Sequence, residues 1–341
     1  MNTGSSRVNA AWRGRHTVLC TVISAALLGQ AAAVSAHAQE GANAYPSKPL
    51  RILVGFAAGG GTDLFARLIG HKLSEQIGQP VVIENKPGAG GRLAAEYAAS
   101  QPADGYTLLL GASGTMAVAS AIYPKLSYHP TRTFRPLTEI ASFPLVLAGT
   151  MNDAITSVGT LVAWAKAHPE KSNYGTSSPA FTIATELFKL KTGMPAQPIP
   201  YKSSNESMLS VAAGQSLFAI ADGPPALPLL HAGKIRALAV TGSARSSELA
   251  DVPSMGEIGL PEVDIRLWAG LFVLESTPPA IAAKLESELR RAIGDVRVRE
   301  KLRGMAVDPE GGTSEDFRRN IERDIARFGA IVTAANLKFE E

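Results

Sequence analysis

The sequence predicts an α/β protein with two lobes, and three observations support this fold class. The chain has 341 residues, which is more than one hydrophobic core usually organises. Its composition, with 45% hydrophobic and 18% charged residues, is that of a globular protein and argues against a disordered chain. From residue 50 onward, short apolar runs typical of strands alternate with longer stretches of helical periodicity. Such alternation indicates sheets covered by helices.

Three strand–turn–helix units follow one another in the first part of the chain. The strands are expected at 50–55, 81–84 and 107–111. Each strand is followed by a turn of small residues, at 57–61, 85–91 and 112–115. Helices are expected after the first two turns, at 64–78 and 93–100. Repeated units of this kind predict a parallel sheet whose strands are joined by crossover helices.

A second series of elements begins after Pro144. Apolar runs predict further strands, at 145–148, 218–221, 235–240 and 267–274. Helical spacing predicts four more helices, at 157–168, ending near 191, starting at 278 and starting at 313. The last of these places a row of apolar residues on one face, namely Phe317, Ile321, Ile325, Phe328 and Val332.

Residues 1–38 are typical of a secretory signal peptide. A basic segment that ends at Arg15 precedes an apolar run over 17–34, and Ala36-His37-Ala38 has the pattern of a cleavage site. A membrane anchor is the alternative, but this apolar run is short and contains polar residues. We therefore expect cleavage after Ala38 and a protein exported to the periplasm. The chain's one cysteine lies in this leader, so the exported part would contain neither disulfides nor a thiolate nucleophile.

The charge distribution gives no reason to expect a nucleic-acid partner. The chain has 33 Lys and Arg against 30 Asp and Glu, a net charge of +3. Only Arg7, Arg13 and Arg15 carry charge before Glu40, so the excess belongs to the leader. The rest of the chain is formally neutral and lacks the basic surface that nucleic-acid binding requires.

The glycine and serine residues of the sequence do not have the spacing that the nucleotide-binding and catalytic motifs require. The pattern G-x-G-x-x-G would need glycine where Leu64 and Leu93 stand, and no phosphate-binding G-x-x-x-x-G-K-[ST] occurs. The segment around Ser113 resembles a nucleophile elbow, but its final position is Thr115 instead of glycine. No metal-binding motif is present. We expect no cofactor and no metal, and an exported serine hydrolase using Ser113 is retained as an alternative function.

The three turns favour an anion-binding site, because each follows a strand and opens a helix. The first amides of a helix have no partner within the helix, and the helix dipole adds partial positive charge. Glycine lets an anion approach these amides closely, so carboxylates and phosphates bind there without arginine. The alternative is that the glycines only permit tight packing of strand against helix. Three such turns together favour a cleft for a small anion.

The sequence resembles the Bug family, the extracytoplasmic solute receptors of tripartite tricarboxylate transporters. Eight motifs occur in the order typical of that family, at 45–54, 56–63, 85–91, 104–111, 123–128, 200–202, 232–241 and 251–253. The resemblance runs from Tyr45 to the end of the chain. It implies a type II periplasmic binding protein fold, in which two lobes joined by a hinge enclose the ligand. The first lobe would comprise 45–146 plus 266–341, and the second 147–265.

The resemblance also implies which residues meet the ligand. The positions that match the family's site are Phe56, Ala58, Gly59, Gly60, Asp63, Ser113, Gly114, Thr115, Gly175, Ser177, Thr182 and Asp222. The amides of Ala58, Gly59 and Gly60 would bind a carboxylate, so Gly60→Val is expected to abolish binding. Asp63 is expected to cap or orient the helix start. Asp222 would either receive an ammonium or hydroxyl group of the ligand or hold the backbone near the hinge.

This sequence departs from the family pattern in the second lobe. Ser203 and Ser204 stand where the family usually has glycines, and Ala221 stands where an aromatic residue is more usual. Pro179 removes one N–H donor from the loop at 176–181, which the resemblance places opposite the carboxylate-binding loop. The carboxylate-binding loop of the first lobe is intact, so the resemblance supports the ligand class and leaves the ligand itself open.

Together these features predict a non-enzymatic binding protein. It would close on a small carboxylate, such as a dicarboxylate, an amino acid or an aromatic acid. The closed form would be presented to membrane permease subunits or to a sensor protein. We expect a monomer. A ligand-sensing receptor without a transport role shares every one of these features and remains open.

Overall fold

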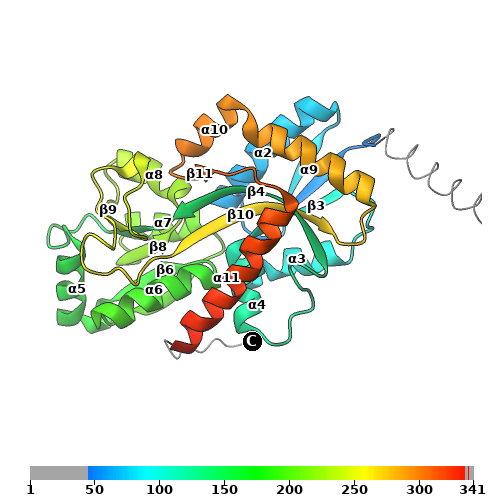
Figure 1. Cartoon of the computed structure of the whole chain (residues 1–341). Coiled ribbons are helices and arrows are strands. Elements are labelled where there is room, and N and C mark those ends of the chain that lie inside the picture. The colour runs from blue at the N-terminus through cyan, green and yellow to red at the C-terminus, as the bar shows by residue number, and fades with distance from the viewer. Residues whose placement is uncertain (1–44, 335–336, 338–341) are drawn as a thin grey trace, which may run out of the picture. The chain divides into compact units, whose positions relative to one another are not determined.

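The computed structural model describes residues 45–334 and 337. The expected signal peptide, residues 1–38, lies outside the described residues. From Lys48 onward the chain belongs to one compact unit, and this unit contains two β-sheets (Figure 1). We call the six-stranded sheet with its helices lobe 1, and the five-stranded sheet with its helices lobe 2. The predicted α/β class is confirmed.

The sheet of lobe 1 is mixed. Its strands lie in the order β11-β4-β10-β3-β1-β2. Their bounds are β1 (Leu50–Val54), β2 (Val81–Asn85), β3 (Thr107–Ala112), β4 (Phe134–Pro144), β10 (Arg266–Leu274) and β11 (Asp308–Pro309). The predicted strands β1, β2 and β3 are parallel, as expected. The long strands β4 and β10 run antiparallel beside each other (Figure 1). The sequence patterns did not predict β4.

The sheet of lobe 2 has the strand order β7-β6-β8-β5-β9. Its bounds are β5 (Val146–Gly149), β6 (Asn173–Thr176), β7 (Gln197–Pro200), β8 (Phe218–Ala221) and β9 (Arg236–Val240). Strand β6 is parallel to β7 and β8, whereas β5 is antiparallel to both β8 and β9. The strands expected at 145–148, 218–221 and 235–240 are confirmed.

Helices cover both sheets, and those that the sequence predicts are present. Lobe 1 carries α2 (Gly61–Ile77), α3 (Arg92–Ala99), α4 (Ala119–Ile122), α9 (Pro279–Gly294), α10 (Val296–Arg303) and α11 (Ser314–Ala334). Lobe 2 carries α5 (Val158–Ala167), α6 (Pro179–Thr192), α7 (Ser204–Ala212) and α8 (Gly223–His231). A single π-helical turn over Gly114–Val118 leads into α4. Among the described residues, none of the helices combines the length and the apolar character needed to cross a membrane.

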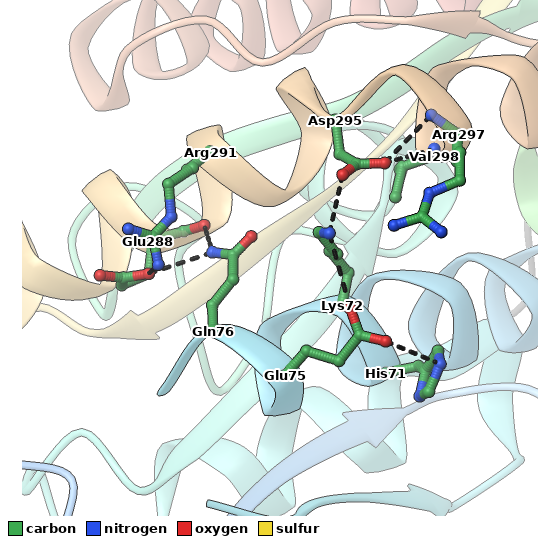
Figure 2. Close-up of polar contacts among 9 residues, drawn as sticks. All are labelled: His71, Lys72, Glu75, Gln76, Glu288, Arg291, Asp295, Arg297 and Val298. Atoms are coloured by element: carbon green, nitrogen blue, oxygen red, sulfur yellow. Dashed lines mark hydrogen bonds and ion pairs between the residues drawn. The ribbon is translucent and has the colours of Figure 1, made fainter. Parts of the chain in front are cut away.

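Helix α2 is fixed in lobe 1 by two of its faces. Its apolar face buries Phe65, Ile69 and Leu73. On another face, Lys72 forms an ion pair of 2.7 Å with Asp295, which caps α10, as Figure 2 shows. One turn further, Gln76 donates to the backbone oxygen of Glu288 in α9, at 2.8 Å. These contacts hold the helix whose N-terminus faces lobe 2.

The segments that join the lobes are linked by Thr241. The Leu145 amide donates to the Thr241 Oγ1 at 2.7 Å, and the Thr241 amide donates back to the Leu145 oxygen at 2.8 Å. The Thr241 hydroxyl donates in turn to the backbone oxygen of Ile265. A single buried side chain thus joins the outgoing segment before β5 to the returning segment before β10.

The most unusual buried group of lobe 1 is Glu139, in the middle of β4. Only 8% of the residue is exposed, and its Oε2 accepts a hydrogen bond of 2.7 Å from Asn320 in α11. Burial raises the pKa of Glu139 to about 8, and the acidic neighbours Glu310 and Asp324 add to this effect. The side chain is therefore neutral in the folded protein at neutral pH.

Glu139 is expected to make stability fall as the pH rises. An unfolded glutamate ionises near pH 4.5, whereas the folded group holds its proton to about pH 8. Between these values the folded state binds more protons, so the free energy of unfolding decreases as the pH rises and levels off above pH 8. Glu139→Gln removes this loss. We expect the melting temperature of the wild type to fall by several degrees relative to the variant between pH 5 and 8.5. Parallel melting curves for the two proteins would contradict the assignment.

Candidate functional site

The N-terminus of α2 points its amides at the space between the lobes. Gly60 is the N-cap residue and supplies no side-chain cap. Gly59, one position earlier, has φ of +84°, a conformation that favours glycine. The turn thus delivers the first amides of a 17-residue helix to the cleft without a capping side chain of its own. Unpaired amides and the helix dipole make this a place where a negative charge is stabilised.

Asp63 fixes the conformation of this turn. Its side chain is buried and accepts hydrogen bonds from the Gly59 amide at 3.0 Å, the Arg67 Nε at 2.9 Å and the Asn85 Nδ2 at 2.9 Å. Burial alone would raise the pKa of Asp63, but these hydrogen bonds and the Arg67 charge together hold it below its ordinary value. Asp63 therefore orients the helix start, as the sequence indicated. The Gly59 amide, expected to meet a ligand, donates to Asp63 in this structure.

Asp222 approaches the same helix start from lobe 2. It follows β8 and is the N-cap residue of α8, yet its side chain does not cap that helix. A capping side chain accepts from the first N–H groups of a helix, but α8 begins with prolines, which have no N–H. The Asp222 carboxyl group is therefore available for contacts outside α8. It lies close to Gly61 of α2, and both Ser204 and the Gly61 amide favour its ionised form. A Cβ atom at Gly61 would lie 1.8 Å from the Asp222 Oδ2.

The environment of Asp222 disfavours its charge. The residue is 3% exposed, and among the described residues its Oδ1 has no hydrogen-bond partner. Burial raises the pKa of Asp222 to about 6, although Ser204 and the amides of Asp222 and Gly61 favour the charged form and partly oppose this. The group is therefore mostly ionised at pH 7 and protonated by a modest fall in pH.

A cavity between the lobes connects the two sides of the site. Six of the residues expected at the site line it, namely Phe56, Gly60, Ser113, Gly114, Ser177 and Asp222. Its volume is about 30 Å³, which is room for about one water molecule. The lobes are thus closely apposed, and an acid of several carbons needs them further apart. Of the described residues that line this cavity, Asp222 alone has an ionisable side chain.

A wider groove of about 690 Å³ adjoins this cavity and shares Phe56, Ser177 and Ser178 with it. Thr182 lines this groove and not the inner cavity. Tyr123 of lobe 1 and Tyr201 of lobe 2 also line it. The groove therefore offers further apolar surface next to the inner cavity.

Five of the expected residues line neither space, namely Gly59 and Asp63, which shape the turn before α2, and Ala58, Thr115 and Gly175. Ala58 is exposed. Thr115 is committed to lobe 1, because its hydroxyl donates to the Gly90 oxygen at 2.9 Å and its own carbonyl accepts from Tyr128 at 2.6 Å. Gly175 lies inside β6, where a Cβ would meet the Ser207 hydroxyl at 2.6 Å. In this structure Thr115 and Gly175 therefore serve the packing within their own lobes.

Several residues that line the inner cavity were not among the site residues expected from the sequence. They are Thr62, Ser178, Ser204, Phe181, Leu267 and Trp268. Thr62 lies within a matched motif, and Ser204 was recognised only as a departure from the family pattern. Ser178 caps α6 by accepting from the Phe181 amide, a role that its position before Pro179 could have indicated. Nothing in the sequence around Trp268 distinguishes it from a core residue of a strand.

Ser113 has a hydrogen-bond partner that does not suit a nucleophile. Its Oγ accepts from the backbone amide of Trp268 at 3.3 Å. The four histidines of the described part, at 71, 129, 168 and 231, make no hydrogen bond to it. The structure therefore gives Ser113 no general base, which a serine hydrolase requires. Within residues 45–334, no group of three or more His, Cys, Asp or Glu side chains is placed to hold a metal ion.

Comparison with known proteins gives consistent results. Residues 65–337 match the family model described as the tripartite tricarboxylate transporter family receptor. Protein BugT of Bordetella pertussis is 33% identical over 302 residues, which cover 87% of this chain and 93% of that protein.

Two solved structures with bound acids share the fold. The R. palustris protein Rpa4515 with adipate has a TM-score of 0.83 and 35% identity, covering 86% of this chain and 99% of its own. MatC from Rhodopseudomonas palustris with bound malate has a TM-score of 0.80 and 29% identity, covering 84% of this chain and 100% of its own. These matches confirm the two-lobed binding-protein fold that the sequence indicated.

Proposed function

Because the chain belongs to the Bug family of tripartite tricarboxylate transporter receptors, we propose that it captures a small carboxylate in the cleft between its lobes. The helix start at Gly60 and Gly61 is the observation that carries the proposal. It presents amides and a helix dipole to the cavity, where the sole ionisable side chain of the described lining residues is an acid. A ligand carboxylate would therefore be bound by backbone dipoles and hydroxyl groups instead of by arginine.

Dicarboxylates are the first candidates. The structural relatives hold adipate and malate, which differ in length and in the presence of a hydroxyl group. One carboxylate would sit at the α2 N-terminus, and the remainder would face Ser177, Ser178 and Ser204 of lobe 2. The Ser177 hydroxyl is buried without a hydrogen-bond partner among the described residues, which supports a ligand contact there. We include Phe56, Gly60, Ser113, Gly114 and Asp222 among the proposed ligand-binding residues, because they line the same cavity.

Capture would proceed by lobe closure. The proposed lobes comprise 45–146 plus 266–341, and 147–265. The chain passes between the two sheets at Leu145 and returns before Arg266, which supports these bounds. Closure buries the ligand and creates the surface that a partner recognises. We propose that the protein acts in the periplasm and that membrane permease subunits are this partner.

Thermal unfolding with a panel of acids tests the ligand class. The panel contains malate, adipate, an amino acid and an aromatic acid, with the uncharged diamide of malic acid as the matched control. A ligand present at about one hundred times its Kd stabilises a protein by about 2.7 kcal/mol. We expect a rise in melting temperature of several degrees with at least one acid and none with the diamide. No shift with any acid, on protein shown by mass spectrometry to be free of ligand, would contradict the proposal.

A further inference from the structure

We propose that the Asp222 carboxylate occupies the place of the ligand carboxylate at the start of α2, and that a binding ligand displaces it as a protonated acid. Capture would then be coupled to the uptake of one proton from solvent. This inference rests on the proposed function, because it concerns how the same site admits its ligand. It gives Asp222 a role opposite to that of a simple ligand contact.

The geometry places Asp222 where an anion is expected. The Gly61 amide favours the ionised form of the Asp222 carboxyl group, although Gly61 belongs to lobe 1 and Asp222 to lobe 2. The atom that a Cβ at Gly61 would strike, at 1.8 Å, is the Asp222 Oδ2. A carboxylate from the opposite lobe thus occupies the most favourable electrostatic position of α2. The remaining cavity of about 30 Å³ has no room for a second carboxylate beside it.

Displacement requires a proton for an electrostatic reason. Two carboxylates in contact in a buried site cannot both remain ionised at low cost, so one of them takes up a proton. The ligand carboxylate would take the amide of Gly61, which is one of the groups that stabilise ionised Asp222. Asp222 would then keep the hydroxyl of Ser204 but lose this amide, and it would face a negative neighbour. The proton therefore goes to Asp222, which as a neutral acid can donate a hydrogen bond to the ligand.

No other charged group near Asp222 accounts for such coupling. On α2, Asp63 is paired with Arg67. Beside α7, the Glu206 carboxylate accepts from the Lys202 amide. The turn over Met305 and Ala306, which packs against Gly223, follows Arg303. None of these charges contributes to the pKa shift of Asp222, which burial dominates.

The unliganded protein tests the first half of the proposal. With selective ¹⁵N-glycine labelling, the Gly61 amide resonance should shift with pH, with a midpoint near 6. The same resonance should not titrate in Asp222→Asn. A Gly61 amide that shows no titration in the wild type would overturn the placement of the carboxylate. This measurement needs no ligand, so it decides the matter even if no acid of the panel binds.

Calorimetry with malate and adipate tests the second half. Titrations at pH 7.2 in two buffers of different ionisation enthalpy give the number of protons taken up on binding. We expect between about half and one proton for the wild type, and a Kd that rises up to tenfold from pH 6.5 to 7.5. Asp222→Asn should bind without proton uptake, with a Kd that does not change over this range. Another buried acid with a raised pKa provides the matched control, and Glu139→Gln should behave as the wild type.

Three results would overturn the coupling. The first is binding by the wild type without proton uptake. The second is proton uptake that persists in Asp222→Asn or vanishes in Glu139→Gln, because the proton would then go elsewhere. The third is a folded Asp222→Asn protein that binds more than 100-fold more weakly, which would show that the ligand needs the ionised carboxylate. Failure of both acids to bind would instead count against the proposed ligand class.

Discussion

Replacing Gly61 by alanine is expected to abolish ligand capture while leaving the protein folded. The added Cβ would lie 1.8 Å from the Asp222 Oδ2 and 3.0 Å from its Cγ, so the Asp222 carboxyl group would have to leave the helix start. The same methyl group would fill the place that a ligand oxygen must occupy to accept from the Gly61 amide. We expect the Kd to rise at least 100-fold, measured by calorimetry with the acid that gives the largest thermal shift.

The fold should tolerate this change because Gly61 is the first residue of α2 and its φ lies outside the left-handed region. Alanine is a better helix former than glycine, so the melting temperature without ligand should stay the same or rise slightly. Gly294→Ala is the matched control, because no atom lies within 4 Å of a Cβ built there. Ligand affinity within threefold of the wild type in Gly61→Ala would remove this helix start from the site.

The sequence led us to expect that a side chain at Gly60 would abolish binding, but the structure leaves more space at Gly60 than at Gly61. A Cβ at Gly60 would be 3.5 Å from its nearest neighbours in Ser203 and Ser204, an ordinary contact distance. The distinction between two adjacent glycines depends on Asp222, which lies far away in the sequence. No local pattern could have revealed it.

The sequence predicted the fold wherever local periodicity and burial agree. Strand β8 is a continuous apolar run, β3 is apolar after Thr107, β1 is interrupted only by Arg51, and α2 and α11 bury regularly spaced apolar faces. The sequence did not predict strand β4 because the strand contains Arg135, Thr138 and Glu139 as well as two prolines, Pro136 and Pro144. Such a run does not resemble a buried strand until tertiary contacts supply Asn320 for Glu139. Burial then neutralises this acid by raising its pKa.

The sequence likewise predicted only part of the candidate site. Helix starts after strands are visible in a sequence, so the turns at Phe56, Gly60 and Ser113 were found. The closeness of the lobes was not, because it depends on residues from several elements that meet only in the folded chain. Trp268 of β10 and Ser178, which precedes α6, line the cavity for this reason. Sequence motifs indicate the helix starts at which backbone amides are available. The packing of the lobes decides which of these amides face the ligand.

Asp63→Ala is expected to weaken both the fold and the site, because one buried carboxylate holds three donors. The change leaves the Gly59 amide and the Asn85 side chain without their acceptor, and it removes the ion pair with Arg67. Arg67 is about half exposed and can turn to solvent, so the loss is smaller than for a fully buried pair. We expect the free energy of unfolding to fall by about 2–3 kcal/mol, measured by urea denaturation at pH 7.

The same variant should bind its acid at least tenfold more weakly, since Gly59 and Gly60 lose the contact that sets their conformation. Arg67→Ala is the matched control, because it removes the ion pair and leaves the contacts from Gly59 and Asn85 to Asp63 intact. The pKa of Asp63 is lowered in the folded state, so its stabilisation is present above its ordinary pKa of 3.8 and is lost as the pH falls below it. The stabilities of wild type and Asp63→Ala should therefore converge in acid. Equal affinities for the two proteins at pH 7 would show that the turn holds its shape without Asp63, and that the helix start alone defines the anion site.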